Sequence, residues 1–165
     1  MSLTGKCNVT LRSYKVVMNK LSFPTTILHG QGALKELAER ITEKNILVVT
    51  DPGLVKAGVV EQALDTLKGS NSEFSIFDGV HPNPIEEDVE KGVEFYRKQE
   101  CDGLLALGGG SAMDVAKVIR FFASHSAPLS QYSVLENGGA KHIETLPAMY
   151  ALPTTAGTGR EVGRG

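Results

Sequence analysis

The chain has 165 residues, of which 41% are hydrophobic and 22% charged, a composition typical of one globular domain with a hydrophobic core. Its net charge of -2 gives no broad positive field, so we expect no binding to nucleic acid or to an anionic membrane surface. The sequence has no apolar run of membrane-spanning length and no secretory signal, and its two cysteines lack metal or redox spacing, so we expect a reducing, cytoplasmic setting.

Short apolar runs alternate with segments of helical periodicity from Phe23 onward, and this alternation predicts an α/β domain with a largely parallel sheet. Residues 1–22 are predicted to form an N-terminal arm with a candidate edge strand, and residues 23–165 the α/β domain. The predicted helices lie at 33–40, at 55–67, after the turn at 81–84 with Ile85 on its apolar face, and after Gly110. The predicted strands lie at 45–51, 74–77, 104–107 and from 148 onward.

The stretch "LLALGGGSAMDVAK" (residues 104–117) joins an apolar run to a helical pattern through three glycines and a serine. Glycine lets the backbone approach a ligand closely, and the first free N–H groups of a helix attract anions. A single tight turn does not need three glycines. The stretch therefore predicts a phosphate-binding turn at Gly109, Gly110 and Ser111.

Three predicted strands end in unusual residues, namely Asp51, the glycine turn, and the threonines of "PTTAGTG". Ligands of open α/β sheets bind at the carboxyl ends of the strands, so these three ends are expected to share one crevice. An acid there accepts hydrogen bonds from ribose hydroxyls and repels a 2′-phosphate, which favours NAD over NADP. Asp51, however, precedes the glycines, whereas the ordinary dinucleotide fingerprint has its acid about 20 residues after them. Asp51 before Pro52 is also a normal helix N-cap, and the threonines are also turn formers.

The segments "GGGSAMDVAK" and "PTTAGTGRE" resemble the two signatures of the iron-containing (group III) alcohol dehydrogenases, especially the lactaldehyde reductase-like members. The segments "VTDPGL" and "GVHPNP" match two further segments of that family in the same order. The resemblance covers roughly residues 23–162. It implies a Rossmann-like, NAD-binding α/β domain that corresponds to the N-terminal half of such an enzyme, with the family's all-helical metal domain absent, so we expect a truncated chain.

The resemblance also implies roles for individual residues. Asp51 would hold the adenosine ribose, and Asn83 would contact the cofactor. Gly109, Gly110 and Ser111 would bind the pyrophosphate through their N–H groups, while Asp114 would lie near the nicotinamide and the substrate. Thr154, Thr155 and Thr158 would line the cleft. Arg160 stands where the family usually has a small residue.

The family's reaction is hydride transfer between an alcohol or aldehyde and the nicotinamide, with a divalent metal, iron or zinc, as Lewis acid. In the family one aspartate and three histidines bind this metal, in the part that would follow Gly165. We therefore expect the chain to bind NAD(H) without oxidising alcohol, to contain no catalytic residue or metal ligand, and to form a homodimer. Its four histidines are expected on the surface or in loops. Two alternatives stay open: a fragment of a glycerol dehydrogenase or dehydroquinate synthase-like enzyme, and a non-catalytic dinucleotide-binding module.

Overall fold

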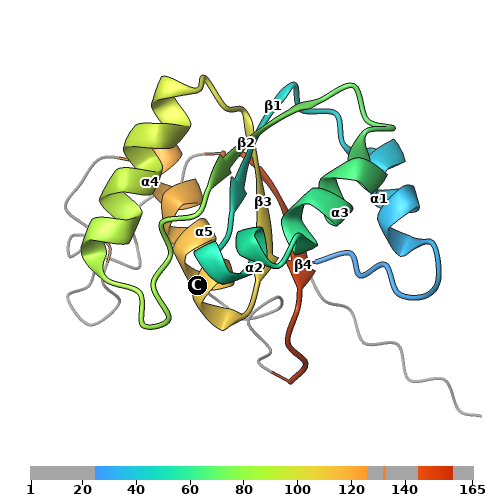
Figure 1. Ribbon diagram of the computed structural model, residues 1–165. Coiled ribbons are helices and arrows are strands. Elements are labelled where there is room, and N and C mark those ends of the chain that lie inside the picture. The colour runs from blue at the N-terminus through green and yellow to red at the C-terminus, as the bar shows by residue number, and fades with distance from the viewer. Residues whose placement is uncertain (1–24, 126–131, 133–144, 158–165) are drawn as a thin grey trace, which may run out of the picture.

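A computed structural model describes residues 25–125, 132 and 145–157, and within them a parallel four-stranded sheet lies between two layers of helices (Figure 1). The predicted α/β class and parallel sheet are therefore confirmed. Residues 1–22 lie outside the described part, so the N-terminal arm stays a prediction. No helix of the described residues is long and apolar enough to cross a membrane.

Five helices and four strands follow one another in the described residues. They are α1 (Ala33–Arg40), β1 (Asn45–Val49), α2 (Pro52–Lys56), α3 (Val59–Leu67), β2 (Glu73–Phe77), α4 (Glu86–Lys98), β3 (Gly103–Gly108), α5 (Gly110–Ser124) and β4 (Ala148–Pro153).

The strand order β2-β1-β3-β4 creates a switch point in the middle of the sheet. From β1 the chain passes through α2 and α3 to β2 on one side. It then returns through α4 to β3 on the other side of β1, and α5 leads further outward to β4. The connections after β1 and after β3 lead in opposite directions, and the carboxyl ends of two such neighbouring strands are where ligands bind in open α/β sheets.

Each face of the sheet buries its own hydrophobic cluster. Leu47 and Val49 of β1 pack with the residues of α4 and α5, whereas Ile46 and Val48 pack with those of α1 and α3. Figure 1 shows these helix pairs on opposite sides of the strands. Since β1 and β3 are covered on both faces, their sequences are continuous apolar runs instead of alternating ones.

The structure corrects three local predictions. The helix predicted at 55–67 is two helices, because Gly58 between them adopts a left-handed conformation with φ of +73°. Ile85 does not lie on the apolar face of α4 but is its exposed N-cap. His125 lies directly after the end of α5, in a loop as the prediction allowed, but it is buried and not on the surface, since its Nδ1 lies 3.0 Å from the Phe121 carbonyl oxygen and its ring stacks on the Phe121 ring. His29 and His81 are exposed as predicted, and His142 lies outside the described residues.

Candidate functional site

The carboxyl ends of β1, β3 and β4 meet at one place. The Thr154 N–H donates to the Gly108 carbonyl across a distance of 2.9 Å. A Cβ built on Gly109 would lie 3.3 Å from Thr155 Oγ1, and one built on Gly108 would lie 3.8 Å from Asp51 Oδ2. Residues from three separated segments therefore converge at the switch point, as their positions after parallel strands led us to expect.

The glycine turn leaves the N-terminus of α5 open. Gly108 has a φ of +156°, and a Cβ there would lie 2.8 Å from Ala112 Cβ, so no larger residue fits. No side chain caps α5 at Gly109, and its first helical hydrogen bond runs from the Met113 N–H to the Gly109 carbonyl. The N–H groups before Met113 belong to the first helical turn, and such N–H groups have no carbonyl partner within the helix. Such a helix end binds anions, so the predicted cradle at Gly109, Gly110 and Ser111 has suitable geometry.

Asp51 uses its two carboxylate oxygens differently. Oδ1 accepts the Leu54 N–H at 3.1 Å, so that Asp51 is the N-cap of α2 with Pro52 in the first turn. Oδ2 lies on the side of Gly108. The capping interpretation of Asp51 is thus confirmed. It does not exclude a second role, because capping occupies one oxygen and leaves the other beside the glycine turn.

The Ser111 hydroxyl links the glycine turn to the turn at 81–84. Its Oγ donates to the Pro82 carbonyl at 2.7 Å, a bond that does not involve the Ser111 backbone N–H on which the predicted role depends. The exposed Asn83 follows Pro82 directly and so is held near the start of α5. Asp114 lies half-buried further along α5. Thr158 and Arg160 lie outside the described residues, and their roles stay predictions.

Sequence reasoning missed one residue of this region, Asp88. This carboxylate lies in the first turn of α4, is 2% exposed, and accepts the backbone N–H groups of His81 and Ile85. Its Oδ1 lies 2.6 Å from His81 Nδ1. The sequence contains no local signal for it, because a capping box is recognised by Ser or Thr at the N-cap and the N-cap of α4 is Ile85.

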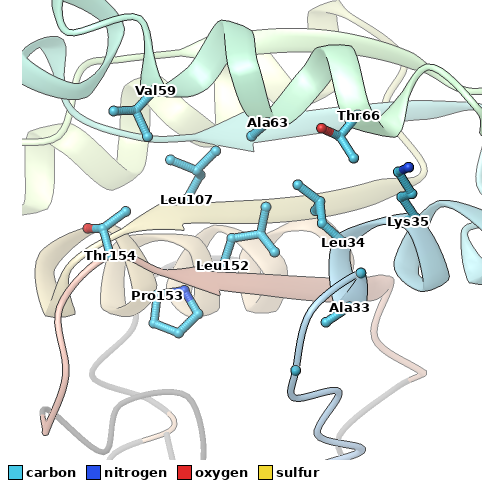
Figure 2. A pocket seen from close by; sticks show the side chains of 12 residues that line it. Ala33, Leu34, Lys35, Val59, Ala63, Thr66, Leu107, Leu152, Pro153 and Thr154 are labelled. Atoms are coloured by element: carbon cyan, nitrogen blue, oxygen red, sulfur yellow. The ribbon is translucent and has the colours of Figure 1, made fainter.

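A cavity of about 560 Å³ lies beside the strand ends, on the face covered by α1 and α3. Figure 2 shows Leu34, Val59, Leu107 and Leu152 around it, with Thr154 at one end. Of the predicted site residues that the structure describes, Thr154 alone lines it. We therefore place the candidate site at the switch point, where the convergent polar groups are, and not in this mainly apolar cavity.

Comparison with known proteins identifies the family. A family model for iron-containing alcohol dehydrogenases matches residues 24–165. The chain belongs to this family. The resemblance found in the signature segments is therefore confirmed.

Several relatives of known structure or function share this part of the family fold. The choline dehydrogenase of Bacillus subtilis (strain 168) is 43% identical over 143 residues, which are 84% of this chain and 35% of that protein. A crystal structure of 1,3-propanediol oxidoreductase is 37% identical with a TM-score of 0.76, and the match covers 90% of this chain and 38% of that one. A sulfoacetaldehyde reductase from Bifidobacterium kashiwanohense, solved with NAD+, is 32% identical with a TM-score of 0.71, over 88% and 38% of the two chains. The chain thus spans little more than a third of the length of these relatives.

An iron-containing alcohol dehydrogenase implies a divalent metal, but the described residues do not fit one. No group of three or more His, Cys, Asp or Glu side chains within them is close enough to hold a metal ion. We assign no metal ligand among these residues and derive no reaction step through a metal. The nucleotide fits better, because a glycine turn and an uncapped helix end form a cradle for its phosphates.

Proposed function

We propose that this chain is the NAD(H)-binding part of an iron-type alcohol dehydrogenase that transfers hydride between a small alcohol or aldehyde and nicotinamide. One observation carries the proposal: in a chain of this family, the uncapped N-terminus of α5, a carboxylate oxygen of Asp51 and the side chain of Thr155 meet at the switch point. When bound, the nicotinamide supplies the hydride acceptor or donor. The chain's own residues bind and orient the dinucleotide.

The proposed contacts follow from the chemistry of each group. The N–H groups at Gly109, Gly110 and Ser111 hold the pyrophosphate at the positive end of the α5 dipole. Asp51 Oδ2 accepts hydrogen bonds from the adenosine ribose, and its negative charge repels a 2′-phosphate. We propose that Asn83, Thr154, Thr155 and Thr158 line the remaining cleft and that Asp114 lies towards the nicotinamide.

A titration of the chain with NADH and with NADPH tests the proposal. We expect NADH to bind more tightly. Asp51→Asn keeps an oxygen for the Leu54 N–H but loses the negative charge. It should therefore reduce the preference for NADH over NADPH by roughly 10- to 100-fold. This estimate follows from the value of about 1.5–3 kcal/mol for a hydrogen bond to a charged group.

Asp102→Asn is the matched control, because Asp102 is likewise a carboxylate bonded to backbone N–H groups, those of Lys44 and Asn45, but lies at the opposite end of the sheet. It should leave the preference unchanged. A folded wild-type chain that binds neither nucleotide, or that prefers NADPH, would refute the proposal.

Three further parts of the proposal concern the protein as a whole. The family match favours the iron-type branch over a glycerol dehydrogenase or dehydroquinate synthase-like fragment. We propose that the chain alone does not oxidise alcohols, which metal-dependent turnover by the purified chain would contradict. We also propose a cytoplasmic homodimer. Cell fractionation tests its location, and light scattering tests its mass.

A further inference from the structure

The turn at 81–84 is fixed from two helices at once. From α5, the Ser111 hydroxyl donates to the Pro82 carbonyl at 2.7 Å. From α4, Asp88 Oδ2 accepts the His81 N–H at 3.2 Å, and Asp88 Oδ1 lies 2.6 Å from His81 Nδ1. Side chains of the two helices therefore hold two consecutive residues of the turn, His81 and Pro82, directly before Asn83.

The Asp88 carboxylate is buried to an unusual degree for an acid. It is 2% exposed and is the only acidic side chain among the described residues that is fully buried. Burial raises its pKa, but the hydrogen bonds from His81 and Ile85 outweigh burial, so the pKa of Asp88 is lowered and the carboxylate is charged at neutral pH. A buried charge is costly unless it is paired and hydrogen-bonded. The contacts to His81 and Ile85 meet this requirement.

Helix capping alone does not account for all of these contacts. A capping box needs one acid oxygen at the N-cap N–H, and Asp88 Oδ2 supplies it to Ile85 at 3.3 Å. The same oxygen also accepts the His81 N–H, and Oδ1 contacts the His81 ring. Both additional contacts go to the turn, outside the helix, and the His81 side chain that makes one of them is 62% exposed. The second function of Asp88 is therefore to hold the turn.

We propose that Asp88 is a positioning residue of the dinucleotide cleft: through its two contacts with His81 it fixes the turn, and so holds Asn83 beside the open end of α5. This inference rests on the proposed function. Asp88 itself does not touch the cofactor. It acts through Asn83, which lies between His81, the residue that Asp88 holds, and the start of α4. Asn83 also directly follows Pro82, the residue that Ser111 holds.

A double-mutant cycle on the chain tests this pathway. NADH dissociation constants are measured for the wild type, Asp88→Asn, Asn83→Ala and the double variant. We expect Asp88→Asn to weaken NADH binding about threefold or more when Asn83 is present, and to have almost no effect when Asn83 is alanine, because coupled residues are not additive. A purely structural effect of Asp88 would weaken binding equally in both backgrounds. Asp102→Asn, which removes a carboxylate bonded to backbone N–H groups far from the turn, should leave the affinity unchanged.

Two additions keep the test decisive if Asp88→Asn folds poorly. His81→Ala removes only the exposed ring, so the fold should persist, and it should weaken NADH binding in the same direction and again only when Asn83 is present. Without cofactor, amide hydrogen exchange at His81 and Ile85 should accelerate in Asp88→Asn while exchange at Leu105 in the core stays slow.

The outcomes separate this inference from the proposed function. If the wild-type chain binds NADH but the effects of Asp88→Asn and Asn83→Ala are additive, the positioning role is overturned and the proposed function stands. Unchanged exchange at His81 in Asp88→Asn also overturns the positioning role. If the folded wild-type chain does not bind NADH at all, the proposed function itself is refuted.

Discussion

The packing of α4 against α5 depends on a glycine, and this dependence gives a sharp prediction. Gly92 is buried inside α4, where a Cβ would overlap Ile119 Cδ1 of α5, would lie 2.9 Å from Ile119 Cγ1, and would lie 3.3 Å from Phe77 Cε1 of β2. Alanine at this position would therefore push Ile119 out of its rotamer or push the two helices apart.

Two opposing effects determine the stability of Gly92→Ala. Overpacking of a filled core costs about 1–3 kcal/mol. Alanine inside a helix is more favourable than glycine by about 1 kcal/mol. We therefore expect Gly92→Ala to lower the free energy of unfolding by about 1 kcal/mol. In an Ile119→Val background, which lacks Cδ1 but keeps Cγ1, the worst overlap is removed while the 2.9 Å contact remains, so the same substitution should destabilise clearly less than in the wild type, with the loss close to zero or at most a few tenths of a kcal/mol, roughly the gain from alanine in a helix against a weaker overpacking cost.

Urea denaturation followed by circular dichroism on the four chains measures this difference between the two backgrounds. The Ile119→Val chain serves as its own reference, because that change alone costs about 0.5–1.5 kcal/mol. If Gly92→Ala destabilised both backgrounds by the same amount, contact with Ile119 would not be the cause. If it stabilised the wild type, α4 and α5 would not be as closely packed as the structure shows.

Two further predictions concern buried polar groups. Thr50 is fully buried at the end of β1, and its Oγ1 has no hydrogen-bond partner in the part of the chain that the structure describes. Thr50→Val should therefore raise the free energy of unfolding by about 1 kcal/mol. A lower stability of this variant in urea denaturation would show that the hydroxyl has a hydrogen-bond partner. Burial and the hydrogen bond to Glu43 Oε2 raise the pKa of Tyr150 to about 12, so stability from this group is complete below pH 10 and is lost between pH 10 and 12. The pKa of Tyr96 is raised in the same way, so its titration contributes to any measurement on the wild type alone. The difference in urea midpoint between the wild type and Tyr150→Phe, followed from pH 10 to pH 12, isolates the contribution of Tyr150. A difference that does not change with pH would contradict the raised pKa of Tyr150.

The sequence predicted the central elements well, for a physical reason. Strands covered on both faces must be apolar throughout, and this made β1 and β3 recognisable. The break between α2 and α3 was missed, since an isolated glycine in an amphipathic run is compatible with a continuous helix. Only the left-handed conformation of Gly58 shows that the helix ends there. For His125, the polarity of the side chain predicted exposure, but stacking on Phe121 and a backbone acceptor make burial acceptable.

The position of the candidate site was predictable from residues that mark a strand end or a helix start. Three glycines before a helix, and an acid at a strand end, indicate a ligand site before any tertiary contact is known. The binding roles of these residues stay predictions, although the structure brings Asp51, the glycine turn and Thr155 together. Asp88 was not predicted, because the first turn of α4 contains three acidic residues, Glu86, Glu87 and Asp88, and this is the composition of an ordinary solvated helix start. Only its burial distinguishes it.

The same kind of bond recurs at three places in and around the site: a polar side chain holds a backbone group of a helix or turn. Asp51 caps α2, Ser111 holds the Pro82 carbonyl, and Asp88 holds the His81 N–H. These bonds fix the loops before a ligand binds, so binding costs less conformational entropy of the loops. They also use only part of each residue, since Asp51 retains Oδ2 and Ser111 retains its N–H. Residues that organise these strand ends therefore keep further polar groups, which explains why the capping interpretation of such a residue and its proposed binding role are compatible.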